Sequence, residues 1–317
     1  DVIHDALTRP GIPVVVVGGG YTGLEAVENL VARGAQVTLV QRSGQLLTPL
    51  DAEMAAPLAD LVRAHGVDLR LGVELVRAQN GAAVLSDGAR VPAELIVDAS
   101  GVVPETALAA RAGLRTGETG GIWVDENCRT SDPAVFAVGD GVEKTDLVGG
   151  GSTLITMAGL ANRHGRMVAD VVAGRSESTR PGLGTGIVSV FGVAAAKVGW
   201  SERQLLAEGR AHYAVHVHPG SHAGYYPDAQ ILSMKLLADP GTDHILGAQI
   251  VGGDGVDKRI DVIATAMQAG MTAAELAHLE LAYAPQFGSA KDAVNILGYV
   301  AENTRTATTP TIQWHEL

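Results

Sequence analysis

The hydrophobic pattern is most regular near the start of the chain, where four consecutive valines occupy residues 14–17. A continuous β-branched run of this kind is typical of a strand buried on both faces of a parallel sheet. It is followed by Gly18, Gly20 and Gly23, and then by apolar positions at helical spacing over residues 24–31. Glycines with this G-x-G-x-x-G spacing between a strand and a helix let the backbone turn tightly and bring a pyrophosphate to the positive end of the helix. The pattern predicts a dinucleotide site, and a purely structural glycine turn is the alternative interpretation.

Strands and helices continue to alternate through about residue 103. The pattern predicts helices over residues 22–33 and 51–65, with a strand over 36–41 between them. Asn80-Gly81 and Asp87-Gly88 are hairpin-turn sequences, which predict a meander of short strands over residues 67–71, 74–79, 82–86 and 89–91. A buried strand over residues 94–99 then leads to Gly101, at the sheet edge where α/β folds bind ligands.

The residue that contacts the adenosine ribose is expected about 20 residues past the glycines, where an acidic side chain indicates NAD. Here the expected strand ends in Gln41-Arg42-Ser43, so the carboxylate is missing and a guanidinium stands in its vicinity. Because Arg42 attracts a 2′-phosphate and a carboxylate would repel it, the sequence favours NADPH over NADH. A solvated loop charge at Arg42 is the alternative.

The chemistry of the next segment, residues 104–179, centres on Gly139-Asp140. The pattern predicts a short apolar strand over residues 134–138 that ends at this pair, and a long helix over residues 152–173. A carboxylate at a strand end can accept hydrogen bonds from a polyol, and a helix N-terminus can face a phosphate or a flavin ring. The alternative is that Asp140 only caps the next turn.

The third segment, residues 180–303, predicts a sheet packed against helices, which is an α+β domain. Strands are expected over residues 187–191, 194–199, 212–218, 231–237 and 245–251, and helices over residues 256–269 and 272–278. His212, His216, His218 and His222 fall close together in this segment. No cysteine or carboxylate cluster accompanies them, so we interpret them as structural or surface residues and expect no metal.

Composition limits the class of protein and of partner. The 317 residues are 46% hydrophobic, which indicates a globular protein of two or three domains. A net charge of −12 argues against nucleic acid and anionic membranes as partners, and no apolar run is long enough to span a bilayer. The single cysteine, Cys128, suits the cytoplasm, and without a C-x-x-C partner it is interpreted as incidental.

Two of these motifs together carry a family resemblance. The sequence TSDPAVFAVGD at residues 130–140, after GGGYTGLE at residues 18–25, resembles the FAD-dependent pyridine nucleotide–disulphide oxidoreductases. The resemblance implies an α/β fold with a Rossmann-like NAD(P)-binding domain over residues 11–103 and the second part of an FAD-binding domain over residues 104–179. An α+β dimerisation domain would follow over residues 180–303.

The same resemblance implies roles for single residues. Asp140, with Gly139, would bind the ribityl chain of FAD, and Tyr21 would lie over the flavin and move aside for the nicotinamide. Glu25 would lie near the flavin and the nicotinamide, and Gly101 would flank the nicotinamide side of the site. Together with Gly18, Gly20, Gly23, Gln41 and Arg42, these residues form the expected cofactor site for FAD and NADPH or NADH.

Within the family, residues 218–227, 255–261 and 281–292 are most similar to the coenzyme A-disulphide reductases. That similarity implies a homodimer in which Tyr225 and Tyr283 reach the partner's disulphide site, where a phenol can protonate a departing thiolate. The expected reaction passes a hydride from NAD(P)H to FAD and then electrons to CoA disulphide. Packed interface aromatics are the alternative interpretation of the two tyrosines.

Other functions of the same family stay open, namely NADH oxidase, peroxidase and polysulphide reductase, as does a non-catalytic nucleotide-binding and dimerisation module. The family's first FAD-binding unit and redox cysteine are not found in this sequence. We therefore expect a fragment that is inactive alone. Residues 1–10 would be a linker from the FAD segment, and residues 304–317 a linker and the start of a rhodanese-like domain.

Overall fold

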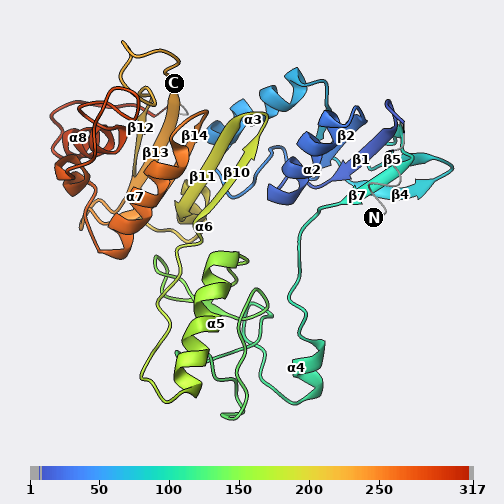
Figure 1. The fold of residues 1–317 in the computed structure, drawn as a ribbon, viewed down its shortest axis with the longest axis horizontal. Coiled ribbons are helices and arrows are strands. Elements are labelled where there is room, and N and C mark those ends of the chain that lie inside the picture. The colour runs from blue at the N-terminus through green and yellow to red at the C-terminus, as the bar shows by residue number, and fades with distance from the viewer. Residues whose placement is uncertain (1–6, 8, 314–317) are drawn as a thin grey trace. The chain divides into compact units, whose positions relative to one another are not determined.

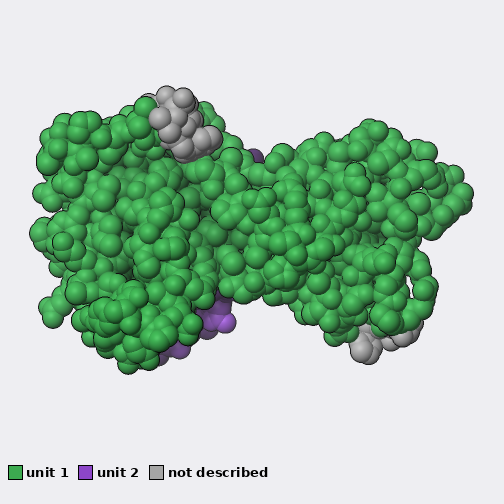
Figure 2. Space-filling view, turned by 90° about the horizontal axis from the view of Figure 1, so that it is seen from above, with its two compact units in different colours: residues 1–101, 187–317 green, residues 102–186 purple. Residues whose placement is uncertain are grey.

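The computed structural model describes residue 7 and residues 9–313 (Figure 1). The described chain divides into two compact units, which Figure 2 colours separately: residues 1–101 with 187–317 form unit 1, and residues 102–186 form unit 2. Most of the expected N-terminal linker, and the last four residues of the expected rhodanese-like start, lie outside the described residues.

The first part of unit 1 contains a four-stranded parallel sheet with the strand order β3-β2-β1-β7. Its strands are β1 (Pro13–Val17), β2 (Gln36–Gln41), β3 (Asp68–Leu71) and β7 (Leu95–Asp98), and its helices are α2 (Tyr21–Ala32) and α3 (Ala52–Ala64). The run of valines is buried, as the continuous apolar pattern predicts. The prediction that residues 67–71 form the first strand of the meander is wrong, because β3 belongs to the parallel sheet. Helix α3 carries the chain back across the sheet, so the strand that follows it enters parallel to β2.

The meander itself has three antiparallel strands, β4 (Leu75–Gln79), β5 (Ala82–Leu85) and β6 (Arg90–Pro92). Asn80 and Gly81 both have positive φ, 51° and 69°, which a two-residue hairpin turn between right-twisted strands requires. Residues of β5 and β6 pack with Val15 and Val40 in one cluster, so this small sheet covers part of the parallel sheet. The two predicted hairpins are confirmed.

The second part of unit 1 is a five-stranded antiparallel sheet with the order β10-β11-β14-β13-β12. Its strands are β10 (Gly186–Val190), β11 (Val193–Gly199), β12 (Tyr213–Val217), β13 (Leu232–Ala238) and β14 (Ile245–Gly252). Helix α7 (Val256–Gln268) packs across β11 and β14 (Figure 1), which confirms the predicted α+β arrangement. Val188, Ala195 and Val251 belong to the same buried cluster as Val14 and Leu24, so the two sheets of unit 1 share one core.

The helices at the end of the chain depart from expectation. Residues 272–278 contain the 3₁₀ helix η1 (Ala274–His278) rather than an α-helix, and α6 (Glu202–Ala207) and α8 (Ala293–Arg305) were not predicted. Helix α8 begins with a capping box in which Asp292 accepts from the Val294 N–H and the Asn295 side chain accepts from the Asp292 N–H. The usual third-position residue of this motif is Glu or Gln, so the sequence signal is weak.

Unit 2 contains α4 (Ala107–Arg111), the short strands β8 (Lys144–Thr145) and β9 (Ser152–Thr153), and α5 (Ala158–Val172). The predicted strand over residues 134–138 is wrong, because within the described chain only Phe136 pairs there, with Arg129. The predicted helix over residues 152–173 is wrong over its first six residues. Ser152 and Thr153 pair with β8, and Met157 is still extended, in a stretch where β-branched residues disfavour helix.

Candidate functional site

The glycine loop between β1 and α2 packs tightly on the carboxyl ends of the neighbouring strands. Gly18 has a φ of +102°, its N–H donates to the Val40 carbonyl at 2.8 Å, and a Cβ there would overlap the Ala99 backbone. A Cβ at Gly23 would overlap the Gly18 carbonyl oxygen, so helix and strand approach too closely for any side chain. Gly20, by contrast, faces open space and begins α2 without a side-chain cap. Free backbone N–H groups at a helix start, beside open space, fit the pyrophosphate of a dinucleotide.

The residues expected beside the flavin lie around this loop. Tyr21 opens α2, half-buried against the core, and burial raises the pKa of its phenol to about 12. Glu25 lies one turn further along α2 and is exposed. Gly101 follows β7 with a φ of +128° and open space around its Cα. The structure brings these residues to the carboxyl edge of the parallel sheet, and their roles toward a cofactor stay predictions.

Gln41 holds the glycine loop, a role that the sequence did not reveal. Its side-chain oxygen accepts from the Gly19 N–H at 2.8 Å, and its amide nitrogen donates to the Ser43 hydroxyl at 2.6 Å. The Ser43 hydroxyl in turn donates to the Gln45 carbonyl at 2.8 Å. The sequence predicts Gln41 as a cofactor-site residue but not its hydrogen bond to the loop, because an amide that supports a backbone N–H leaves no separate pattern.

Arg42, next in the chain, is exposed and available to bind an anion. Its side chain is 84% exposed, and its nearest carboxylate oxygen, on Glu74, lies 3.8 Å from Nε. An exposed ion pair of this kind contributes at most about 1 kcal/mol. The guanidinium can therefore exchange Glu74 for a phosphate at small cost, which fits the expected NADPH preference.

In unit 2 the Gly139-Asp140 turn is held from inside by Lys144. The Lys144 ammonium group is buried and donates to the carbonyls of Gly139 at 2.8 Å and Val142 at 2.9 Å. Burial lowers the pKa of Lys144, although the charge of Asp140 acts against this. Asp140 is exposed, and Gly139, with a φ of +97°, faces open space. The expected placement of Asp140 at a strand end is wrong, since no strand forms there, but its carboxylate remains available to a polyol.

Cys128 lines a cavity of about 380 Å³ in the same unit, together with Lys144, His164 and Trp123. The thiol is fully buried, and burial with the nearby Asp125 charge raises its pKa to about 11. A thiol in this state is a poor nucleophile. The structure is therefore in line with the interpretation of Cys128 as incidental to the chemistry.

Tyr225 and Tyr283 meet although 58 residues separate them. Their hydroxyl oxygens lie 2.8 Å apart, and the side chains are 78% and 48% exposed. The hydrogen bond from Tyr225 raises the pKa of Tyr283. Tyr283 thus keeps its hydroxyl hydrogen at neutral pH, and the pair can offer one hydroxyl hydrogen to a group in solvent.

The three segments that carry the closer resemblance support this tyrosine pair. The Ala223 N–H donates to the Gly288 carbonyl at 2.9 Å, which ties the two tyrosine loops together. Arg259, buried at the start of α7, donates to the Ser221 carbonyl at 2.7 Å and to Asp292 at 3.0 Å. The buried Arg259 guanidinium therefore binds one residue next to each of the two tyrosine loops, Ser221 and Asp292.

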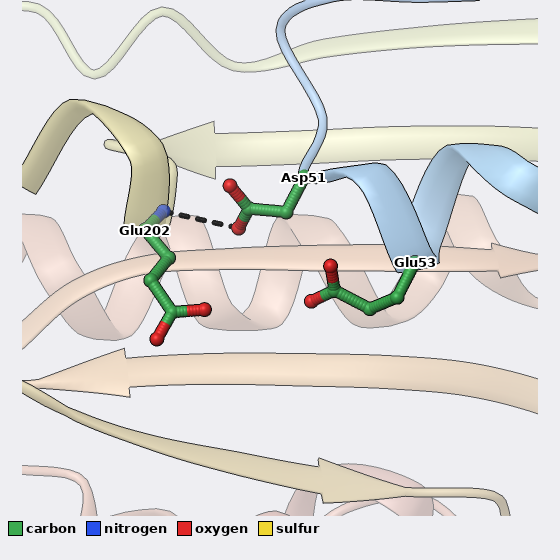
Figure 3. Close-up of side chains that lie close together, drawn as sticks. All are labelled: Asp51, Glu53 and Glu202. Atoms are coloured by element: carbon green, nitrogen blue, oxygen red, sulfur yellow. Dashed lines mark hydrogen bonds between the residues drawn. The ribbon is translucent and has the colours of Figure 1, made fainter. Parts of the chain in front are cut away.

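A buried charge cluster that the sequence did not predict lies between the two sheets of unit 1. Figure 3 shows Asp51 and Glu53 at the start of α3 facing Glu202 of α6, with Asp51 accepting from the Glu202 N–H at 3.0 Å. The Lys235 ammonium group, fully buried on β13, lies 3.0 Å from Asp51, 2.6 Å from Glu202 and in hydrogen-bond contact with Glu53. The three carboxylates are close enough to hold a metal ion, but the ammonium group takes the place that such a cation would fill.

Contacts within the cluster shift the pKa values of Glu53 and Lys235. Burial alone would raise the pKa of Glu53, but hydrogen bonds from His216 and Lys235 and the Lys235 charge lower it to about 2. Burial acts to lower the pKa of Lys235, but the Asp51 charge and the hydrogen bonds that Lys235 donates to the carboxylates raise it overall. Lys235 and Glu53 therefore stay charged together at neutral pH.

The histidine interpretation needs a correction here. His212 lies 3.2 Å from Glu202 and His216 lies 3.3 Å from Glu53, so these two do have carboxylate partners. Glu53 lies 163 positions from His216 in the chain, so sequence proximity could not reveal that contact, whereas Glu202 lies only 10 positions from His212. The available sequence signal is Lys235 itself, a lysine inside a strand that is apolar apart from Ser233.

Among the described residues, no helix is both long and apolar enough to span a bilayer.

Family models match nearly the whole chain. The model of the pyridine nucleotide-disulphide oxidoreductase family matches residues 3–165, and that of the corresponding dimerisation domain matches residues 186–294. A coenzyme A disulfide reductase from Staphylococcus haemolyticus is 32% identical over 293 residues, 91% of this chain and 66% of that protein. An NAD(P)H coenzyme A polysulfide/persulfide reductase from Pyrococcus horikoshii is 33% identical over 292 residues, 90% of this chain and 65% of that protein. The chain spans slightly less than two thirds of the length of these relatives.

Two solved structures are similar in fold and sequence. The crystal structure of reduced Bacillus anthracis CoADR-RHD matches with a TM-score of 0.94 and 42% identity, covering 96% of this chain and 55% of that chain. An NAD-dependent persulfide reductase from A. fulgidus matches with a TM-score of 0.96 and 36% identity, covering 99% of this chain and 59% of that chain.

Proposed function

The chain belongs to the pyridine nucleotide–disulphide oxidoreductase family, and from this premise we propose that the protein containing it passes electrons from NADPH through FAD to CoA disulphide. The observation that carries the choice of acceptor is the Tyr225–Tyr283 hydroxyl pair, which presents a proton donor at the surface of the dimerisation domain. The balanced reaction consumes one NADPH and one proton and converts one disulphide into two thiols.

At the nucleotide end, the backbone of the glycine loop would bind the pyrophosphate and Arg42 the 2′-phosphate. Open space at Gly20 and the exposure of Arg42 support these roles. Tyr21, at the head of α2, would cover the nicotinamide pocket until the nucleotide enters, and Glu25 and Gly101 would flank it.

In unit 2, the turn at Gly139-Asp140 would hold the ribityl chain, with the carboxylate accepting hydrogen bonds from its hydroxyls. The open space in front of Gly139 and the support from Lys144 fit a ligand backbone that approaches closely. Bound FAD would supply the two-electron chemistry, taking hydride from the nicotinamide and reducing a disulphide.

At the disulphide end, one tyrosine hydroxyl would donate to its neighbour, and the remaining hydroxyl hydrogen would go to the sulphur of the departing CoA thiolate. The raised pKa of Tyr283 supports a donor rather than a base. Because Tyr225 and Tyr283 are exposed, they are accessible to a partner subunit, and we propose a cytoplasmic homodimer that shares them across its interface.

A second acceptor is favoured by a specific observation, since two of the similar proteins are named persulfide reductases. Assays of the purified full-length protein with CoA disulphide, polysulphide and oxygen separate the candidates. The proposal expects NADPH-dependent release of two CoA thiols per disulphide. Faster turnover of polysulphide would favour the second acceptor. A colourless protein without flavin absorbance would support a non-catalytic module instead.

A further inference from the structure

The loop between β2 and α3 connects the glycine loop with the buried charge cluster of the dimerisation sheet. We call residues 45–51 the strap, and Asp51, Gln249 and Lys235 the anchor at its end. Neither a nucleotide nor a disulphide is expected to touch the anchor. It nevertheless holds a segment that packs directly on the glycine loop.

The strap meets the glycine loop through Leu46 and Leu47. The Leu47 N–H donates to the Gly19 carbonyl at 2.8 Å, and the Leu46 side chain lies against Gly19 so closely that a Cβ there would overlap it. Both leucines are completely buried. A displacement of the strap therefore cannot leave the loop unchanged.

Leu47 also adopts a strained backbone conformation, with a φ of +44°. A bulky residue in the left-handed region is strained and persists only where its surroundings impose this conformation. Here the surroundings are the Gly19 hydrogen bond on one side and the anchored end of the strap on the other.

Asp51, at the far end of the strap, is bound to three elements of the dimerisation domain: β14, α6 and β13. The Asp51 N–H donates to the Gln249 side-chain oxygen at 2.8 Å, and the Gln249 amide donates back to the Asp51 carboxylate at 2.5 Å. The same carboxylate accepts from the Arg203 N–H at 3.1 Å and pairs with Lys235 at 3.0 Å. The Arg203 guanidinium donates to the Thr48 carbonyl, within the strap itself.

We propose that Gln249 and Lys235 are positioning residues for the nucleotide: through Asp51 and the strap they hold the glycine loop in the conformation that binds NADPH or NADH. This inference rests on the proposed nucleotide site. The anchor acts on the pyrophosphate loop, which is common to both nucleotides, whereas Arg42 acts on the 2′-phosphate alone. Loss of the anchor should weaken both nucleotides equally.

The test compares Gln249→Met with Tyr213→Phe in the full-length protein. Gln249→Met removes both hydrogen bonds to Asp51 without leaving a new charge. Tyr213→Phe removes a hydrogen bond to Asp243, on the edge strand of the same sheet, without touching the strap. Equilibrium titration gives the Kd of NADPH and of NADH, urea unfolding gives the stability, and hydrogen exchange reports on the Leu47 N–H.

Gln249→Met is expected to raise both Kd values by the same factor, about 5- to 10-fold, and to speed exchange of the Leu47 N–H. Tyr213→Phe is expected to lower stability and leave both Kd values unchanged. If Gln249→Met does not fold, Arg203→Ala replaces it, because that side chain is exposed and its guanidinium bond to Thr48 is lost; a smaller rise in both Kd values is then expected.

Unchanged Kd values in folded Gln249→Met or Arg203→Ala, or weaker binding of NADPH alone, would overturn the inference. A wild-type protein that binds neither nucleotide would instead refute the proposed function, so the two failures are distinguishable.

Discussion

At the scale of single residues, we expect the proposed nucleotide preference to depend on Arg42 and on the Glu74 carboxylate beside it. Arg42 and Glu74 are both mostly exposed, and their 3.8 Å separation makes a weak pair that a 2′-phosphate can replace. In the proposed site Arg42 would attract the 2′-phosphate, and Glu74 would compete with that phosphate for the guanidinium.

Arg42→Ala is expected to weaken NADPH binding about tenfold, the loss of about 1.4 kcal/mol, and to leave NADH binding unchanged. Glu74→Gln is the matched opposite change and should strengthen NADPH binding, again without effect on NADH. Titration of both nucleotides against both variants measures this. Equal effects of Arg42→Ala on the two nucleotides would contradict the assignment of Arg42 to the 2′-phosphate.

The tyrosine pair makes a second prediction at this scale. Tyr283→Phe and Tyr225→Phe each remove half of a hydroxyl pair and are expected to lower kcat for CoA disulphide about 100-fold in the full-length enzyme. Reduction of the flavin by NADPH, followed by stopped-flow absorbance, should stay at the wild-type rate. Tyr299→Phe is the control, because Tyr299 lies on α8 and has Lys291 over its ring. Wild-type kcat in both variants would show that the pair is only an interface contact.

At the scale of elements, the strand–loop–helix unit depends on two glycines in different ways. Gly23 is required because its Cα packs against the Gly18 carbonyl, whereas Gly20 faces open space. One glycine thus serves packing, and the other leaves room for a ligand. The sequence pattern assigns both to the same fingerprint and does not separate these roles.

Gly23→Ala is expected to destabilise unit 1 by about 1–3 kcal/mol, since helix and strand must separate to admit a methyl group. Gly20→Ala should unfold at the wild-type urea concentration and yet bind nucleotide more weakly, because the methyl group projects into the open space. The contradicting result is a Gly20→Ala variant that binds NADPH as the wild type does.

The elements also show how far the sequence could be interpreted. The valine run, the glycine spacing and the Asn80-Gly81 turn each act over a few residues, so the parallel sheet and the hairpins could be predicted. Whether residues 134–138 form a strand could not be predicted from their own pattern. A strand needs a neighbouring strand to pair with, and an apolar run does not show whether one is present. Long-range partners account for the missed features: Asp51 meets Lys235 and Gln249 from almost 200 positions away.

At the scale of the whole molecule, the two sheets of unit 1 share a hydrophobic core, and the buried charge cluster joins the start of α3 to β13 and α6. Helix α3 packs on β3 of one sheet and on β13 and β14 of the other, and the cluster lies at its N-terminus. The proposed nucleotide site and the dimerisation domain therefore belong to one continuous unit.

Glu53 makes the cluster's stability depend on pH. Its pKa is lowered from 4.5 to about 2 in the folded protein, so its contribution is complete above pH 4.5 and is lost as the pH falls through about 2. Glu53→Gln is expected to be less stable than the wild type at neutral pH, and the difference should close between pH 4.5 and 2. Urea unfolding across this range measures it, and a difference that stays constant with pH would contradict the role of the Glu53 charge.

The family and the α/β fold with its dimerisation domain, both expected from the motifs, are confirmed by the comparisons. The roles of single residues at the cofactor and disulphide sites stay predictions, because they depend on groups that meet the chain only when bound. Among these, the tyrosine pair has the strongest geometric support.

The most direct test of the central claim is an anaerobic single-turnover experiment on the full-length protein. NADPH is added first and CoA disulphide second, while flavin absorbance and free thiol are recorded. The account predicts that NADPH bleaches the flavin, that CoA disulphide restores its absorbance, and that two CoA thiols appear per NADPH oxidised. A reduced flavin that CoA disulphide does not reoxidise, while oxygen does, would contradict the account.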